Sequence, residues 1–141
     1  MLAAQKNETY RALLEKMTPE SVDPGVRETL RQLRERGYLL AVGSSSRNAK
    51  TILSRTGLAD AFDAVSDGTN ITRSKPDPEV FLKAAEFLRV KPEQCAVVED
   101  AHSGIDAAVA AGMLPVGIGD AANYEKSVYQ IQTIFALLEY F

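Results

Sequence analysis

The sequence has few of the residues on which secreted and membrane-spanning proteins depend. Its 141 residues include a single cysteine, Cys95, so no intrachain disulfide can form, which fits a reducing compartment. Cys95 precedes the apolar run 96–98 and is interpreted as a buried structural thiol rather than a nucleophile. No apolar run approaches the ~20 residues of a membrane span, and we expect no signal peptide. The cytoplasm is therefore the expected compartment.

The sequence also has no large excess of charge of one sign. Its 16 basic and 19 acidic residues give a net charge of −3, so no overall field favours nucleic acid or an anionic membrane. A hydrophobic content of 45% and a charged content of 25% are typical of a soluble globular domain. Any anion must therefore be bound through local geometry.

Apolar strands alternate with amphipathic helices along the chain. Strands are predicted at 39–42, 62–66, 95–98, 114–119 and 129–132, and helices at 1–17, 26–36, 49–56, 79–90, 103–111 and 134–141. Alternation with short connections is typical of a parallel sheet with right-handed crossovers. The sequence predicts an α/β fold, a three-layer Rossmann-like parallel sheet with helices on both faces.

A polar cluster follows the first of these strands directly. Residues 44–48 read Ser-Ser-Ser-Arg-Asn and offer hydroxyl groups, backbone N–H groups, a guanidinium and an amide. Open α/β sheets bind ligands at the carboxyl ends of their strands, and this donor set suits an anion, most simply a phosphate. A serine-rich turn without a ligand is the alternative.

Two further polar groups are predicted at the same edge of the sheet. Lys75 precedes the helix 79–90, and Glu99 and Asp100 follow the strand 95–98. Phosphoryl transfer needs donors for phosphate oxygens, a cation against developing charge and carboxylates for a divalent metal, which Ser44, Lys75 and the acidic pair supply. Ligands that are all oxygen point to Mg²⁺ rather than zinc. Each motif alone is also common in solvated turns.

In their order, these motifs resemble the haloacid dehalogenase superfamily, which has a serine or threonine after its second strand, a lysine ahead of a helix and acidic metal ligands after its fourth strand. Within it, the chain is most similar to the β-phosphoglucomutases. The matching runs are Gln-Lys-Asn at 5–7, Ser-Ser-Ser-Arg-Asn at 44–48, Ser-Lys-Pro-Asp-Pro at 74–78 and Glu-Asp-Ala-His-Ser-Gly-Ile at 99–105. The resemblance runs from Leu2 to about Gly119.

The resemblance implies an enzyme that transfers phosphate between positions of a sugar phosphate, interconverting β-glucose 1-phosphate and glucose 6-phosphate. It implies that Ser44 and Lys75 hold the transferring phosphate, with help from the backbone of Ser45, and that Glu99 and Asp100 ligate Mg²⁺.

A second phosphate of the sugar is the other ligand that the resemblance implies. It would be held by Ser46, Arg47 and Asn48, and Lys6 would reach the substrate from the cap. Arg47 stands where the family usually has lysine, and its guanidinium can bind phosphate bidentately. His102 falls at a variable family position and is predicted to be a solvated loop residue.

One motif of the family is missing. Its members begin with a strand ending in Asp-x-Asp-Gly, whose first aspartate is the nucleophile, whereas this sequence has no two aspartates separated by one residue. The run Asp-Gly-Thr at 67–69 resembles only the end of that motif, because Val65 stands at the nucleophile position. The likeness implies that 1–17 is a remnant cap helix, that 18–141 is the core domain, and that the first strand is missing.

Two consequences follow from that missing motif. No carboxylate is placed to form an aspartyl-phosphate, so the chain alone is predicted to be inactive. The missing strand is the middle one of the family's sheet, so its neighbours would have unpaired backbone groups, each costing about 1–3 kcal/mol when buried. We therefore expect an amino-terminal segment or a second chain to complete the sheet.

Two other functions stay open. One is a phosphatase of the same superfamily that acts on a small phosphorylated metabolite. The other is a non-catalytic phosphate- or metal-binding fragment that is completed by a partner.

Overall fold

In the computed structural model of the chain, residues 9–10 and 24–141 are described. Their strands are β1 (Thr9–Tyr10), β2 (Ala41–Gly43), β3 (Ala64–Ser66), β4 (Ala96–Glu99), β5 (Leu114–Ile118) and β6 (Tyr129–Ile131). Their helices are α1 (Pro24–Glu35), α2 (Ala49–Arg55), α3 (Glu79–Leu88), α4 (His102–Ala110) and α5 (Leu137–Tyr140). Short 3-10 turns are η3 (Ala59–Ala61), η4 (Pro92–Gln94), η5 (Gly119–Asn123) and η6 (Ile134–Ala136). The helices and strands predicted within 24–141 all occur, with ends shifted by a few residues.

The six strands form one parallel sheet in the order β3-β2-β1-β4-β5-β6. From β1 the chain proceeds outward through β2 to β3 and then crosses to β4 on the other side of β1. This reversal of direction creates a topological switch point, where open α/β sheets bind ligands at the strands' carboxyl ends. The predicted fold class is confirmed.

Strand β1 lies in the middle of the sheet, where a missing strand was expected. Tyr10 is paired in parallel register with Val42 of β2 on one side and with Val98 of β4 on the other. Thr9 and Tyr10 therefore lie in a strand and not in the predicted helix 1–17, most of which is outside the described residues. The long-range need of β2 and β4 for hydrogen-bonding partners explains why the local helical spacing gave a wrong prediction at these two residues.

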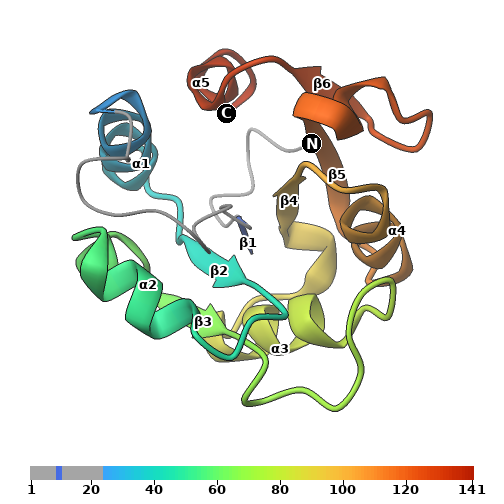
Figure 1. Cartoon of the computed structure of the whole chain (residues 1–141). Coiled ribbons are helices and arrows are strands. Elements are labelled where there is room, and N and C mark those ends of the chain that lie inside the picture. The colour runs from blue at the N-terminus through green and yellow to red at the C-terminus, as the bar shows by residue number, and fades with distance from the viewer. Residues whose placement is uncertain (1–8, 11–23) are drawn as a thin grey trace.

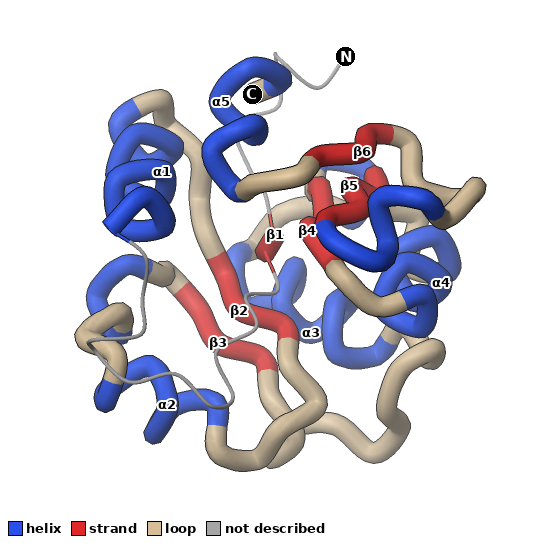
Figure 2. The backbone as a smooth tube through the Cα atoms, turned by 45° about the horizontal axis from the view of Figure 1, so that its top comes forward, coloured by secondary structure: helices blue, strands red, loops and turns tan. Residues whose placement is uncertain are grey.

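Helices cover both faces of the sheet, as Figures 1 and 2 show. On one face, α1, α2 and α5 bury Leu33, Leu53 and Leu137 together with Val42 and Val98 of the sheet. On the other face, the core cluster is formed by α3, α4 and the sheet, through the buried residues Val80, Phe81, Ala85, Cys95, Val97, Ala107, Ala108, Ala111 and Met113. The neighbours Val97 and Val98 thus face opposite layers, as the two-residue period of a strand requires. Cys95 is buried, as predicted.

Candidate functional site

Lys75 connects the ends of two strands at the carboxyl edge of the sheet. Its ammonium donates a hydrogen bond of 3.1 Å to the carbonyl oxygen of Gly43, at the end of β2. It also forms a 3.1 Å ion pair with Oε2 of Glu99, at the end of β4. The Lys75 and Glu99 side chains are only 8% and 0% exposed, so the two charges lie largely out of water. Because β1 lies between β2 and β4, the lysine spans the centre of the sheet.

The loop that carries Lys75 is closed by acidic side chains that accept backbone hydrogen bonds. The Glu79 carboxylate accepts the N–H groups of Arg73 at 2.8 Å and Thr72 at 2.6 Å, and these two donors lower the pKa of Glu79. Asp77 accepts the N–H of Glu79 at 3.0 Å. These bonds fix the approach of residues 72–79 to helix α3 and thereby the position of Lys75.

The other oxygen of the Glu99 carboxylate is bound by backbone. Its Oε1 accepts the N–H groups of Asp100 at 3.1 Å and Ala101 at 3.3 Å, just before α4 begins. Glu99 thus holds Lys75 with one oxygen and the start of α4 with the other. Two backbone donors and an ammonium are the environment that a buried carboxylate needs in order to stay charged.

The serine-rich segment after β2 has a preformed loop structure. Ser44 is 2% exposed, and its hydroxyl oxygen accepts the N–H of Ser46 at 3.2 Å. The Ser46 hydroxyl oxygen in turn accepts the N–H of Asn48 at 3.0 Å. Arg47 and Asn48 are exposed. The serines therefore order the loop, and Ser44 directly follows the carbonyl group that binds Lys75.

A second loop, 66–70, supports the serine-rich segment, and its importance was not predicted. The N–H of Gly68 donates 3.0 Å to the carbonyl of Ser46, and a Cβ at Gly68 would lie 2.5 Å from the carbonyl oxygen of Ser45. Asp67 is buried and accepts the N–H of Thr69 at 2.9 Å through Oδ1. In the sequence, the run 67–69 resembles only the end of the missing nucleophile motif, and its glycine is the signal for this close approach of two backbone segments.

The structure brings together the residues of three of the predicted motifs. Ser44, Lys75 and Glu99 converge at the ends of β2 and β4, with Asp100 half-buried beside Glu99. Lys6 lies outside the described residues. A hydroxyl, an ammonium and carboxylates therefore meet at one edge of the sheet, as phosphoryl transfer would require.

The acidic pair fits Mg²⁺ as one part of its coordination shell. Among the described residues, no three His, Cys, Asp or Glu side chains gather so that they could hold a metal ion. Mg²⁺ is usually bound through one or two carboxylates, with water and substrate phosphate as its other ligands. Asp100 and Glu99 can supply those carboxylates, although Glu99 would have to share its oxygens with Lys75 and two N–H groups.

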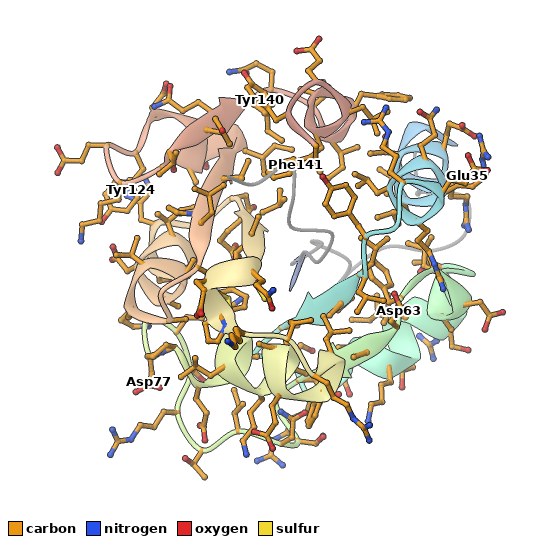
Figure 3. The ribbon with its side chains drawn as sticks, turned by 180° about the vertical axis from the view of Figure 1, so that it is seen from behind. Glu35, Asp63, Asp77, Tyr124, Tyr140 and Phe141 are labelled. Atoms are coloured by element: carbon orange, nitrogen blue, oxygen red, sulfur yellow. The ribbon has the colours of Figure 1, made fainter. Side chains whose placement is uncertain are left out.

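A cluster of side chains connects helix α4 to the loop after β5. The rings of His102 and Tyr124 are stacked, with centroids 4.1 Å apart, and the Tyr124 hydroxyl donates 2.7 Å to Asp106. Lys126 donates 3.1 Å to the same oxygen. The Tyr124 hydroxyl and, second, the Lys126 ammonium lower the pKa of Asp106. Figure 3 shows Tyr124 on the side of the molecule where α4 lies. His102 is exposed, but it begins a helix and stacks on a ring instead of lying in a solvated loop.

No helix in the described part of the chain is both long and apolar enough to cross a membrane.

Comparison with known proteins identifies relatives of this chain. A family model for haloacid dehalogenase-like hydrolases matches residues 2–112. The β-phosphoglucomutase of Bacillus subtilis (strain 168) is 45% identical over 118 residues, which cover 84% of this chain and 52% of the relative. The fructose-1-phosphate phosphatase YqaB of Escherichia coli (strain K12) is 37% identical over 119 residues, covering 83% of this chain and 61% of the relative.

A solved structure of a haloacid dehalogenase-type enzyme also resembles this chain. The crystal structure of a β-phosphoglucomutase from Clostridium difficile superposes with a TM-score of 0.81 at 33% identity, covering 91% of this chain and 58% of that one. The chain thus spans between half and two thirds of the length of these relatives.

Proposed function

Because the chain belongs to the haloacid dehalogenase-like hydrolases, we propose that its site binds the phosphate of a sugar phosphate for phosphoryl transfer of the β-phosphoglucomutase type. The observation that carries the proposal is the Lys75 ammonium, held between Glu99 and the carbonyl group of Gly43, which Ser44 follows in the chain. A buried cation next to a hydroxyl and backbone donors is the environment that stabilises phosphate oxygens as charge develops on them.

In this proposal each side of the site has a separate task. Ser44, the N–H of Ser45 and Lys75 bind the transferring phosphate. Glu99 and Asp100 hold Mg²⁺, which when bound supplies positive charge against the phosphate oxygens.

The exposed part of the serine-rich segment binds a second phosphate. Ser46, Arg47 and Asn48 form that site, with Lys6 as a further cation for the substrate. A guanidinium on an exposed loop suits a phosphate that arrives with the substrate, since its planar fork can bind two oxygens at once.

Turnover needs a nucleophile that these 141 residues do not supply. The last residue of β1, Tyr10, is level with Val42 and Val98, one residue before Gly43 and Glu99. The sequence has no Asp-x-Asp pair to place a carboxylate at this edge of the sheet. We propose that a further segment or a second chain provides it, and that the 141-residue chain alone binds phosphate and Mg²⁺ without turnover.

Phosphate binding is the first test. Inorganic phosphate is titrated into the 141-residue chain with and without MgCl₂, followed by calorimetry. Lys75→Met should raise the Kd by about ten- to one-hundred-fold, the range for a lost hydrogen bond to a charged group. The matched control is Lys83→Met, which removes the same charge from an exposed site in α3. Equal affinities of wild type and Lys75→Met would contradict the proposal.

Activity is the second test. The 141-residue chain with β-glucose 1-phosphate, a bisphosphate primer and Mg²⁺ should give no glucose 6-phosphate. Normal turnover would show that no outside nucleophile is needed.

A phosphatase is the second candidate, and the match to a fructose-1-phosphate phosphatase favours it. On a chain to which the nucleophile-bearing segment has been restored, the ratio of bisphosphate-dependent isomerisation to phosphate release separates the two activities. In a mutase, Arg47→Ala should reduce isomerisation more than phosphate release, because only a mutase must bind two phosphates.

A further inference from the structure

The ring of Phe81 lies against the ammonium group of Lys75. Phe81 belongs to α3 and is completely buried. Its ring centroid is 4.9 Å from Lys75 Nζ, which is within the distance at which a cation is attracted by an aromatic face. The ring thus adds a third contact to those that Lys75 makes with Gly43 and Glu99.

Gly43 makes room for this arrangement. A Cβ at Gly43 would lie 2.7 Å from Cδ1 and 2.8 Å from Cε1 of Phe81, so a larger residue at the end of β2 would push the ring away. The same glycine binds Lys75 through its carbonyl oxygen. Gly43, the Phe81 ring and the Lys75 ammonium therefore pack together, and the position of each depends on the other two.

The chemistry of the ring suits a lysine that must exchange partners. An aromatic face attracts the ammonium through its quadrupole and has no lone pair that competes for a phosphate oxygen. A polar residue at this place would instead hold the ammonium by a hydrogen bond, which phosphate would have to break. The ring also excludes water from one side of the ammonium, which strengthens its attraction for an anion.

We propose that Phe81 is a positioning residue for phosphate binding, which holds the Lys75 ammonium at the sheet edge through its ring face. This inference rests on the proposed function of Lys75 and deepens it.

The test uses Phe81→Leu, which keeps the position apolar but removes the ring. Phe62→Leu is the matched control, because Phe62 is also buried but packs in the core cluster of the opposite face. Inorganic phosphate is titrated into wild type and both variants with MgCl₂. We expect Phe81→Leu to raise the phosphate Kd by about five- to thirty-fold, the range for a largely desolvated cation–π contact, and Phe62→Leu to leave it unchanged.

A second measurement separates this inference from the proposed function. In ¹³C-lysine-labelled protein without phosphate, the Hε protons of Lys75 should show an upfield ring-current shift, which Phe81→Leu abolishes and Phe62→Leu keeps. Lys75→Arg assigns the signal. If wild type binds no phosphate, the proposed function fails, and the Lys75 signal still decides whether the ring holds the ammonium.

Two results would overturn the inference: an unchanged Lys75 signal in Phe81→Leu, or a folded Phe81→Leu protein that binds phosphate as wild type does. If Phe81→Leu does not fold, Phe81→Met replaces it, because the flexible thioether fills irregular space without a ring face.

Discussion

Gly104 in the first turn of α4 leaves the space that the side chain of Glu99 occupies. A Cβ at Gly104 would lie 2.0 Å from Cγ and 2.1 Å from Cδ of Glu99, far inside van der Waals contact. The carboxylate can therefore reach Lys75 and the two N–H groups before α4 only because residue 104 has no side chain.

Gly104→Ala should for this reason destabilise the protein, although alanine favours helices over glycine. The added methyl group must displace Glu99 or move α4, at a cost of about 1–3 kcal/mol. Urea unfolding of the variant measures this cost. Ser103→Ala is the control, since Ser103 is exposed in the same turn and its loss should change stability by less than about 0.5 kcal/mol. A Gly104→Ala protein as stable as wild type would show that Glu99 has room to move.

Gly68→Ala should act on the serine-rich segment. Its Cβ would lie 2.5 Å from the carbonyl oxygen of Ser45 and 3.0 Å from the backbone nitrogen of Arg47. Because these are backbone atoms, the loop itself must shift, and Ser45 and Ser46 move away from the anion. We expect phosphate affinity to fall by about tenfold, as when one hydrogen bond to a charged group is lost. Titration with inorganic phosphate measures the change, and an unaltered affinity would show that this loop does not bind the anion.

The core of the fold could be predicted because the necessary signals are local. The strand around Val42 and the strand around Val98 are apolar runs of strand length, and each is followed by polar residues. Once both strands were assigned to a parallel sheet, the meeting of Ser44 and Glu99 at one edge followed from topology. Lys75 was added through its place in the order of motifs.

The contacts that position these residues could not be predicted, because they join distant parts of the chain. Thr9–Tyr10 lies in a stretch with helical spacing, and its strand exists through pairing with β2 and β4. Neither the contact of the Phe81 ring with Lys75 nor the space at Gly104 can be recognised from the spacing of apolar residues in the sequence. These contacts depend on how the crossover connections place distant segments, and the periodicity of apolar residues gives no information about that placement.

The cluster at Asp106 predicts a dependence of stability on pH. Hydrogen bonds from Tyr124 and Lys126 lower the pKa of Asp106 below its ordinary value of 3.8. The folded state therefore favours the charged carboxylate. This stabilisation is fully present at a pH above the pKa that Asp106 has in the unfolded chain. It is lost as the pH falls through the lower pKa that Asp106 has in the folded protein. Asp106→Asn should be less stable than wild type at pH 7, and this difference should shrink below about pH 4. Thermal unfolding from pH 7 to pH 3 measures it, and a difference that is constant with pH would contradict the assignment.

The pair of Lys75 and Glu99 should show strong coupling in a double-mutant cycle. One oxygen of Glu99 accepts a hydrogen bond from the Lys75 ammonium, and the other accepts hydrogen bonds from two backbone N–H groups. A glutamine has only one side-chain oxygen, so its NH₂ group would point at one of these donors. Glu99→Gln should therefore cost about 3–5 kcal/mol, as when one partner of a buried ion pair is removed.

Lys75→Met should cost less than Glu99→Gln, since the carboxylate keeps its two backbone donors. The double variant Lys75→Met/Glu99→Gln should lose less stability than the sum of the two single variants, because no ammonium is then left without its anion. Urea unfolding of the four proteins gives the coupling energy. Arg34 and Asp63 provide the comparison, since they form an ion pair of 3.0 Å between side chains that are 41% and 24% exposed. That pair should show a coupling of about 0.2–1 kcal/mol. Equal coupling energies for the two pairs would mean that burial at the sheet edge adds nothing to the attraction between Lys75 and Glu99.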